Sequence, residues 1–135
     1  MKKLWNIAFG YFLAAMAGGV FYREFTKFFA FSGKTVLADI HVHLLVLGTV
    51  VFLFLGLAAK TTDLLEQKKF GLFLKLYNVA LPVMVFLMLC RGVIQTAEIS
   101  ISNGADAAIA GIAGLTHIAM AALWIFLFRI LRKLK

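Results

Sequence analysis

Four long apolar blocks, separated by short polar segments, constrain this chain more than any other feature. They cover residues 4–21, 38–59, 72–90 and 108–128. Each is close to the roughly 20 residues that a helix needs to cross about 30 Å of hydrocarbon. None alternates with the period of two that is typical of a half-buried strand, and lipid admits only helices or closed barrels. The pattern predicts an all-α integral membrane four-helix bundle.

Composition argues against a soluble globular domain. Of the 135 residues, 63% are hydrophobic and only 15% are charged. A soluble domain of this length has too little interior to bury that much apolar surface. Since the length is typical of one domain, we expect residues 1–135 to form a single transmembrane domain whose surroundings are the lipid bilayer.

The basic residues predict the orientation of the bundle. With a cytoplasmic N-terminus, ten cations lie at cytoplasmic helix ends and four at outer ends, and the positive-inside rule favours that arrangement. We therefore expect the protein to span the cell membrane of a bacterium with both termini inside. Because this orientation accounts for most of the net charge of +8, we expect no nucleic-acid partner. The outer cations are Arg23, Lys27, Lys34 and Arg91; the inner ones are Lys2, Lys3, Lys60, Lys68, Lys69, Lys75, Arg129, Arg132, Lys133 and Lys135.

The same topology assigns the connecting segments to the two sides. Residues 22–37 and 92–107 are expected to be outer loops, and Asn103 and Gly104 are typical turn residues within the second of them. Residues 61–71 are expected to form the inner linker.

All three histidines lie in the apolar helices. His41 and His43 fall in the first turns of the second helix, and His117 falls in the fourth, so the topology places all three in the outer half of the membrane. Ionisable residues inside a membrane are costly and usually functional, and neutral imidazole is a common iron ligand. We expect metal or haem ligation; the alternative is hydrogen bonding between packed helices.

The spacing of His41 and His43 restricts how they can act. Two positions along an α-helix correspond to about 200° of rotation. The two side chains therefore point in nearly opposite directions and cannot hold one iron together from an unbroken helix. They serve either two different sites or one site built between two copies of the chain.

Small residues accompany the histidines. Gly48 follows His41 by seven residues on the same face, and Gly111, Gly114 and His117 run at i, i+3 and i+6 along the fourth helix. A flat macrocycle beside a helix needs such a groove. The alternative is close helix–helix packing through small residues.

Two arginines at the predicted outer rim are candidates to bind anionic haem propionates. Arg91 ends the third helix and Arg23 ends the first. Arginine binds carboxylates in a bidentate fork. The alternatives are snorkelling at the interface and an ion pair between Arg23 and Glu24.

Pro82 lies inside the third helix. It frees the carbonyl of Asn78 and should kink the helix. The side chains of Asn78 and Tyr77 are the expected partners for the freed carbonyl.

Several segments resemble a small uncharacterised bacterial family of four-helix membrane proteins. They are residues 21–28, 41–48, 76–78, 91–92 and 111–117. The H-x-H-x-x-x-x-G segment at residues 41–48 is also similar to one in the haem–copper oxidase subunit I superfamily and its NnrS-type relatives. This second resemblance covers the second helix only.

The oxidase resemblance implies an arrangement of subunits. The oxidase core has twelve helices in three arcs of four, so a four-helix chain resembles one arc and three copies would rebuild the core. This implies a homotrimer with haem b at each interface, ligated by His41 of one chain and His43 of its neighbour. The alternative is one haem inside the bundle, held by His117 with His43 or His41. The additional copper-site histidines have no counterpart here, so oxygen or nitric oxide reduction is not expected.

Three classes of function remain open. The first is a haem b-binding, cytochrome-like membrane protein for electron transfer, haem handling or redox sensing, working with a redox partner or quinone. Ligation by two histidines leaves no open iron position, so an electron carrier is expected more than an enzyme. The second class is a metal-binding or quinone-reactive enzyme that uses His117. The third is a haem-free scaffold, transporter or accessory subunit.

Overall fold

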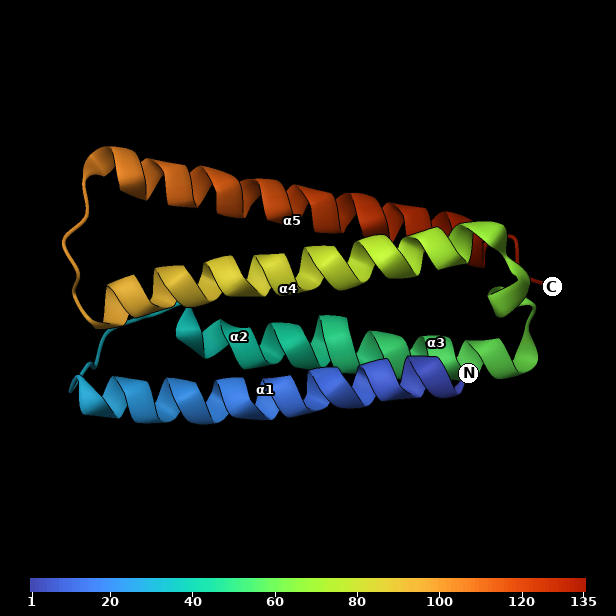
Figure 1. The fold of residues 1–135 in the computed structure, drawn as a ribbon, viewed down its shortest axis with the longest axis horizontal. Coiled ribbons are helices and arrows are strands. Elements are labelled where there is room, and N and C mark those ends of the chain that lie inside the picture. The colour runs from blue at the N-terminus through green and yellow to red at the C-terminus, as the bar shows by residue number, and fades with distance from the viewer.

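The computed structural model describes residues 1–135 and contains only helices and their connections (Figure 1). Three elements, α2, η1 and α3, run on without a break as one span, Leu37–Thr61. The result is four spans, each long and apolar enough to cross a membrane, which confirms the predicted all-α four-helix fold. The elements are α1 (Lys2–Phe28), α2 (Leu37–His43), the π-helix η1 (Leu44–Val50), α3 (Val51–Thr61), the 3-10 turn η2 (Leu64–Glu66), α4 (Lys68–Thr96) and α5 (Asn103–Leu131).

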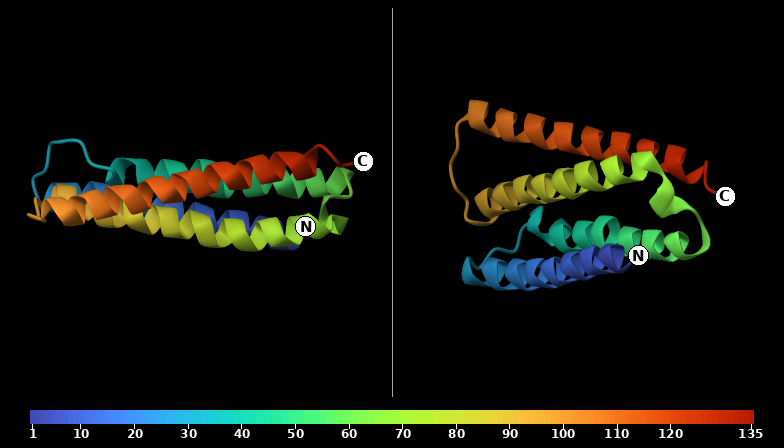
Figure 2. Two further views of the ribbon diagram at one scale, coloured as in Figure 1. Left: turned by 90° about the horizontal axis from the view of Figure 1, so that it is seen from above. Right: turned by 45° about the vertical axis from the view of Figure 1, so that its right-hand side comes forward.

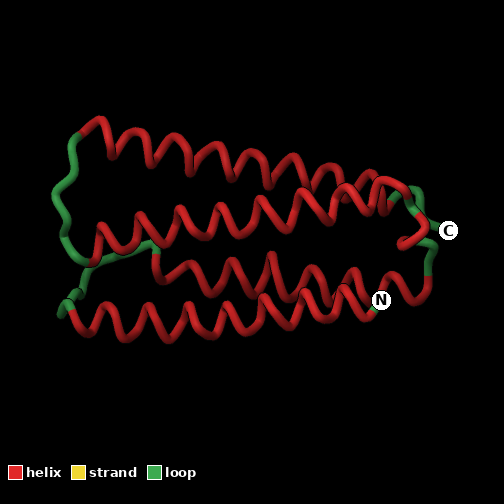
Figure 3. The backbone as a smooth tube through the Cα atoms, in the orientation of Figure 1, coloured by secondary structure: helices red, strands yellow, loops and turns green.

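The four spans form an open row. α1 packs against the second span, α2 packs against α4, and α4 packs against α5. As a result, α1 and α5 occupy opposite edges (Figures 1 and 2). Both termini lie beside the 62–67 connection, at what we call the terminal end (Figure 3). Loops 29–36 and 97–102 lie at the opposite end, the loop end.

The helices extend beyond the apolar blocks that predicted them. α1 continues to Phe28, α4 covers Lys68–Thr96, and α5 begins at Asn103. The prediction of a turn at Asn103 and Gly104 was wrong. The reason is that the Ser102 hydroxyl accepts a hydrogen bond from the Ala105 N–H at 3.2 Å, which caps a helix starting at Asn103.

Glycines allow the second span to approach α1 closely. A Cβ atom on Gly48 would lie 2.5 Å from Cγ of Tyr11, and one on Gly56 would collide with the indole of Trp5. Without a hydrophobic driving force between helices in lipid, such close van der Waals packing supplies much of the association energy. The contact between α1 and the second span therefore depends on these two glycines.

Buried polar side chains tie the start of α2 to the end of α4. The Thr35 hydroxyl donates to the carbonyl of Gly92 at 3.2 Å, and the Thr96 hydroxyl donates to the Thr35 oxygen at 3.1 Å. The Val36 N–H donates to Oε1 of Gln95 at 2.9 Å. These bonds fix both the position and the rotation of α2, which carries two of the three histidines.

The π-helix η1 begins directly after His43. Tyr77 of α4 is fully buried, and its hydroxyl donates to the carbonyl of Leu47 inside η1 at 2.9 Å. A π segment widens the helix by about one residue and is often found at functional sites. Tyr77 thus stabilises an irregular stretch of backbone next to His43.

Asn78 joins α4 to α1. Its Nδ2 donates to the carbonyl of Leu74 at 2.8 Å, and its Oδ1 accepts from the hydroxyl of Tyr11 at 3.0 Å. Asn78 and Tyr77 therefore bond other groups than the carbonyl freed by Pro82, contrary to the expectation from sequence.

Candidate functional site

His43 of α2 and His117 of α5 lie side by side, although they are 74 positions apart in the sequence. Their ring centroids are 6.3 Å apart and their planes make an angle of 85°. His43 is half-buried and His117 is exposed. The fold thus brings two imidazoles from different spans to one place.

Both rings are oriented in the same way. Nδ1 of His43 lies 2.8 Å from the carbonyl oxygen of Asp39, and Nδ1 of His117 lies 2.8 Å from that of Ala113. A carbonyl oxygen can only accept, so each Nδ1 is the donor, and a neutral imidazole held in this way leaves its Nε2 lone pair free for a ligand. Metal-ligating histidines are typically oriented by such a bond.

The first half of α5 has no buried residue. Its buried side chains are Met120, Leu127 and Ile130, all beyond His117. A Cβ atom built on Gly111 or Gly114 would meet nothing within 4 Å. Figure 1 shows α5 close to α4 near the terminal end and diverging from it toward the loop end. The helix beside His117 therefore has an uncovered surface of small residues.

His41 lies on the other side of the second span. A Cβ atom on Gly19 of α1 would lie 3.7 Å from Cβ of His41, so this histidine faces α1. Its Nδ1 is buried and has no hydrogen-bond partner. His41 and His43 thus face different helices, as the rotation of about 200° predicts. Gly48, the expected groove residue beside His41, is covered by Tyr11.

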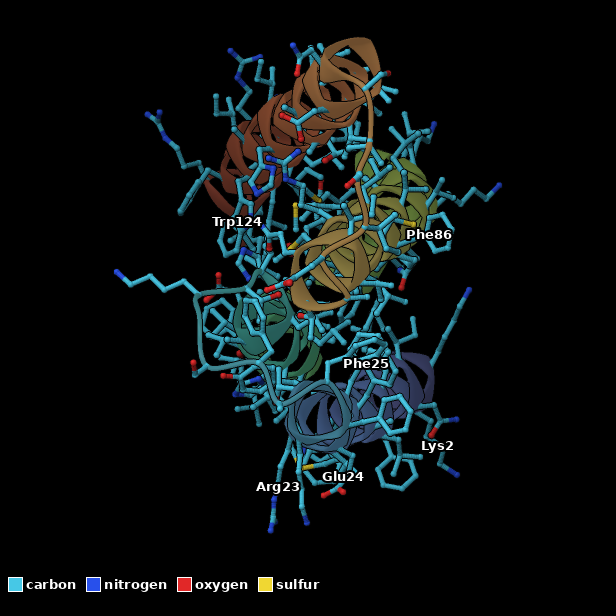
Figure 4. All side chains as sticks on the ribbon, turned by 90° about the vertical axis from the view of Figure 1, so that its left-hand side faces the viewer. Lys2, Arg23, Glu24, Phe25, Phe86 and Trp124 are labelled. Carbon is cyan, nitrogen blue, oxygen red and sulfur yellow. The ribbon has the colours of Figure 1, made fainter.

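The two candidate arginines have different surroundings. Arg91 of α4 donates from Nη1 to Oδ1 of Asp106 on α5 at 2.6 Å, joining the two helices toward the loop end. Arg23 pairs with its neighbour Glu24 at 3.7 Å. Both Arg23 and Glu24 project from α1 away from the other spans (Figure 4). Of the two arginines, only Arg91 is bonded to α5, the helix that carries His117.

Asp106 was not a candidate from the sequence. It was expected in an outer loop, whereas it lies in the first turn of α5. An acidic residue in the first turn after a serine N-cap is a sequence signal of a helix start, and Ser102 with Asp106 could have been recognised as one. Nowhere in the chain is a group of three or more His, Cys, Asp or Glu side chains placed to hold a metal ion.

A family model described as "Protein of unknown function (DUF2871)" matches residues 1–134. The chain belongs to this family. No curated protein and no solved structure matches the chain significantly. For this DUF2871 protein, no match provides a link to haem–copper oxidases or NnrS proteins. The resemblance to those proteins therefore depends on residues 41–48 alone.

Proposed function

We propose that this DUF2871 protein binds one haem b per chain, with His43 and His117 as the two axial ligands. The observation that carries the proposal is the pair of perpendicular imidazoles 6.3 Å apart, each with Nδ1 bonded to its own helix. We further propose that the protein spans the cell membrane of a bacterium with both termini inside, so that the haem lies toward the outer face.

The separation of the two rings fits a shared metal. A nitrogen ligand lies about 2 Å from a bound metal ion. The centre of an imidazole lies about 1 Å behind its nitrogen, given ring bonds of about 1.3 Å. Two imidazoles on opposite sides of one ion thus have centroids about 6 Å apart. The 6.3 Å separation of His43 and His117 agrees with this value.

A macrocycle suits this pair better than a bare metal ion. Protein sites for bare ions such as Zn²⁺ use three or four side-chain ligands, and no group of three is present here. A porphyrin supplies four nitrogens itself and needs only two axial ligands. It also needs flat open space, which Gly111 and Gly114 provide beside His117.

Ligation by two histidines favours electron transfer, haem handling or redox sensing, because it leaves no open iron position. When bound, such a haem accepts and donates single electrons. The protein would supply the ligands, the dry apolar surroundings and, through Arg91, a cation for a propionate. Arg91 would then exchange its bond with Asp106 for one with the haem. A redox partner or quinone at the outer face belongs to the same proposal.

An arrangement between chains remains the second candidate. The open row leaves α1 and α5 as free edges, and the unpartnered Nδ1 of His41 is unusual for a buried polar atom. In this arrangement three chains associate, and His41 of one chain ligates the same haem as His43 of its neighbour. It retains His43 and makes His117 dispensable.

Haem titration of purified variants tests both arrangements. We expect the wild-type protein to bind one equivalent of hemin and to develop a Soret band with sharp α and β bands on reduction. His43→Ala and His117→Ala should each lose this spectrum, and His41→Ala should keep it. Gly114→Leu should weaken uptake by filling the open surface, whereas Gly10→Leu, at another open glycine, should not.

The other outcomes are equally informative. Loss in His41→Ala with retention in His117→Ala would replace the site within one chain by the site between chains. Full haem in both His43→Ala and His117→Ala would show that the ligand assignment is wrong. A wild-type protein that takes up no hemin would exclude a haem function and leave the pair as a packing contact, as expected for a scaffold or transporter.

A further inference from the structure

A basic cleft opens at the terminal end, between the start of α4 and the end of α5. It has a volume of about 720 Å³. Its wall includes the apolar side chains of Phe126 and Ile130, and five of its seven polar residues are cationic. The cations are Lys68, Lys69, Arg129, Arg132 and Lys133.

No carboxylate forms an ion pair with these five cations. The ion pairs of the protein are Arg23 with Glu24 and Arg91 with Asp106, and neither involves a cleft residue. Glu66 is the only acidic residue that lines the cleft, and it forms no ion pair. Several like charges gathered around one concave surface create a strong positive potential. A bound anion would therefore stabilise this end of the bundle.

The cleft is held in shape by local hydrogen bonds. The backbone N–H of Lys135 donates to Oδ1 of Asp63 at 3.1 Å, and Nε2 of Gln67 donates to Oδ2 of Asp63 at 2.7 Å. These bonds fasten the C-terminal segment beside the start of α4. In addition, α4 begins at Lys68 without a side-chain cap, so its free N–H groups add to the attraction for an anion.

We infer that this cleft binds the phosphate headgroup of an anionic phospholipid. The ligand chemistry is that of a phosphate, and its position favours a lipid over soluble phosphate. The cleft lies where two of the apolar spans end, so a surrounding bilayer would bring its headgroups to this depth, and Phe126 and Ile130 give the cleft an apolar side for the first part of an acyl chain. The inference rests on the proposed orientation, which puts this end on the cytoplasmic side, where basic pockets between spans are known to hold such headgroups.

This inference is independent of the haem proposal, because the cleft and the histidine pair are built from different residues. It also differs from the general positive-inside signal. That signal requires only cations on one side, whereas here five of them converge on one cavity, from the start of α4, the last turn of α5 and the two residues that follow α5.

Native mass spectrometry of the full-length protein in detergent tests the inference. The protein is incubated with equal amounts of tetraoleoyl cardiolipin, palmitoyl-oleoyl phosphatidylglycerol and palmitoyl-oleoyl phosphatidylcholine. We expect retention of cardiolipin and phosphatidylglycerol over phosphatidylcholine. Each cation near an anionic headgroup contributes about fivefold to affinity, so the triple variant R129Q/R132Q/K133Q and the double variant K68Q/K69Q should each bind at least tenfold less anionic lipid.

The matched control is K2Q/K3Q/K75Q, which removes three cations from the same end of the bundle but outside the cleft. It should retain anionic lipid as the wild-type protein does. Circular dichroism of each variant checks that the helices are intact. An equal loss in the control would overturn the inference, because general charge would then suffice. Displacement of the lipid by inorganic phosphate at equal concentration would also overturn it, in favour of a soluble phosphate ligand.

Discussion

Replacing Tyr77 with Phe tests whether the hydroxyl holds the π-helix η1 in place. Tyr77 is fully buried, and its hydroxyl donates to the carbonyl of Leu47 at 2.9 Å. The substitution removes this donor and with it the bond to the Leu47 carbonyl. A hydrogen bond of this kind contributes about 1 kcal/mol net in proteins, and bonds between membrane helices average about 0.6 kcal/mol with a maximum near 1.7. We therefore expect the free energy of unfolding to fall by about 1 kcal/mol, or roughly fivefold in the equilibrium constant.

The assay is a reversible unfolding titration with SDS in mixed micelles, followed by far-UV circular dichroism. Tyr22→Phe is the matched control, since the hydroxyl of Tyr22 has no hydrogen-bond partner among the side-chain bonds of the protein. Tyr77→Phe should unfold at lower SDS than the wild-type protein, and Tyr22→Phe should not differ from it. Equal stability of all three would refute the view that Tyr77 stabilises η1.

Two further predictions concern helix contacts. Gly48→Val should lower the free energy of unfolding by about 1–3 kcal/mol in the same titration, because overpacking forces the Tyr11 ring away. The control Gly10→Val should be nearly neutral, and an equal loss of stability in both variants would contradict close packing at Gly48. Arg91→Gln should lower the free energy of unfolding by less than about 1 kcal/mol, since the ion pair of Arg91 with Asp106 is partly exposed. The same variant should weaken hemin uptake in the haem titration, and unchanged uptake would exclude a contact between Arg91 and a propionate.

The sequence was sufficient to predict the fold class but not the helix ends. Hydrocarbon thickness sets a minimum length of apolar residues, and four blocks of that length leave few alternatives. Helix ends outside the hydrocarbon depend on local capping instead. Ser102 starts α5 five residues before the apolar block, and α1 continues through a charged segment to Phe28.

The candidate site could be predicted only in part. The rotation between His41 and His43 follows from helix geometry alone, and the two residues do face different helices. Which helix each one meets depends on the order of spans in the row. It also depends on the π-helix after His43, which changes the phase of the second span by about one residue. No periodicity in the sequence contained that information, so the pairing of His43 with His117 remained one alternative among several.

The role expected for Gly48 shows a related ambiguity. A small residue on a histidine-bearing face fits a cofactor groove and a helix contact equally well from sequence. The ring of Tyr11 occupies the space beside Gly48, whereas the space beside Gly114 is open. Only the positions of neighbouring helices distinguish the two glycines.

Electron paramagnetic resonance of the hemin-reconstituted ferric protein tests the proposed ligation most directly. Ligation by His43 and His117, with ring planes at 85°, predicts a low-spin signal of large g anisotropy, as expected for perpendicular imidazoles. A high-spin signal would show that one histidine does not bind the iron. A low-spin signal of small anisotropy would indicate nearly parallel ligand planes, and would contradict this histidine pair as the site.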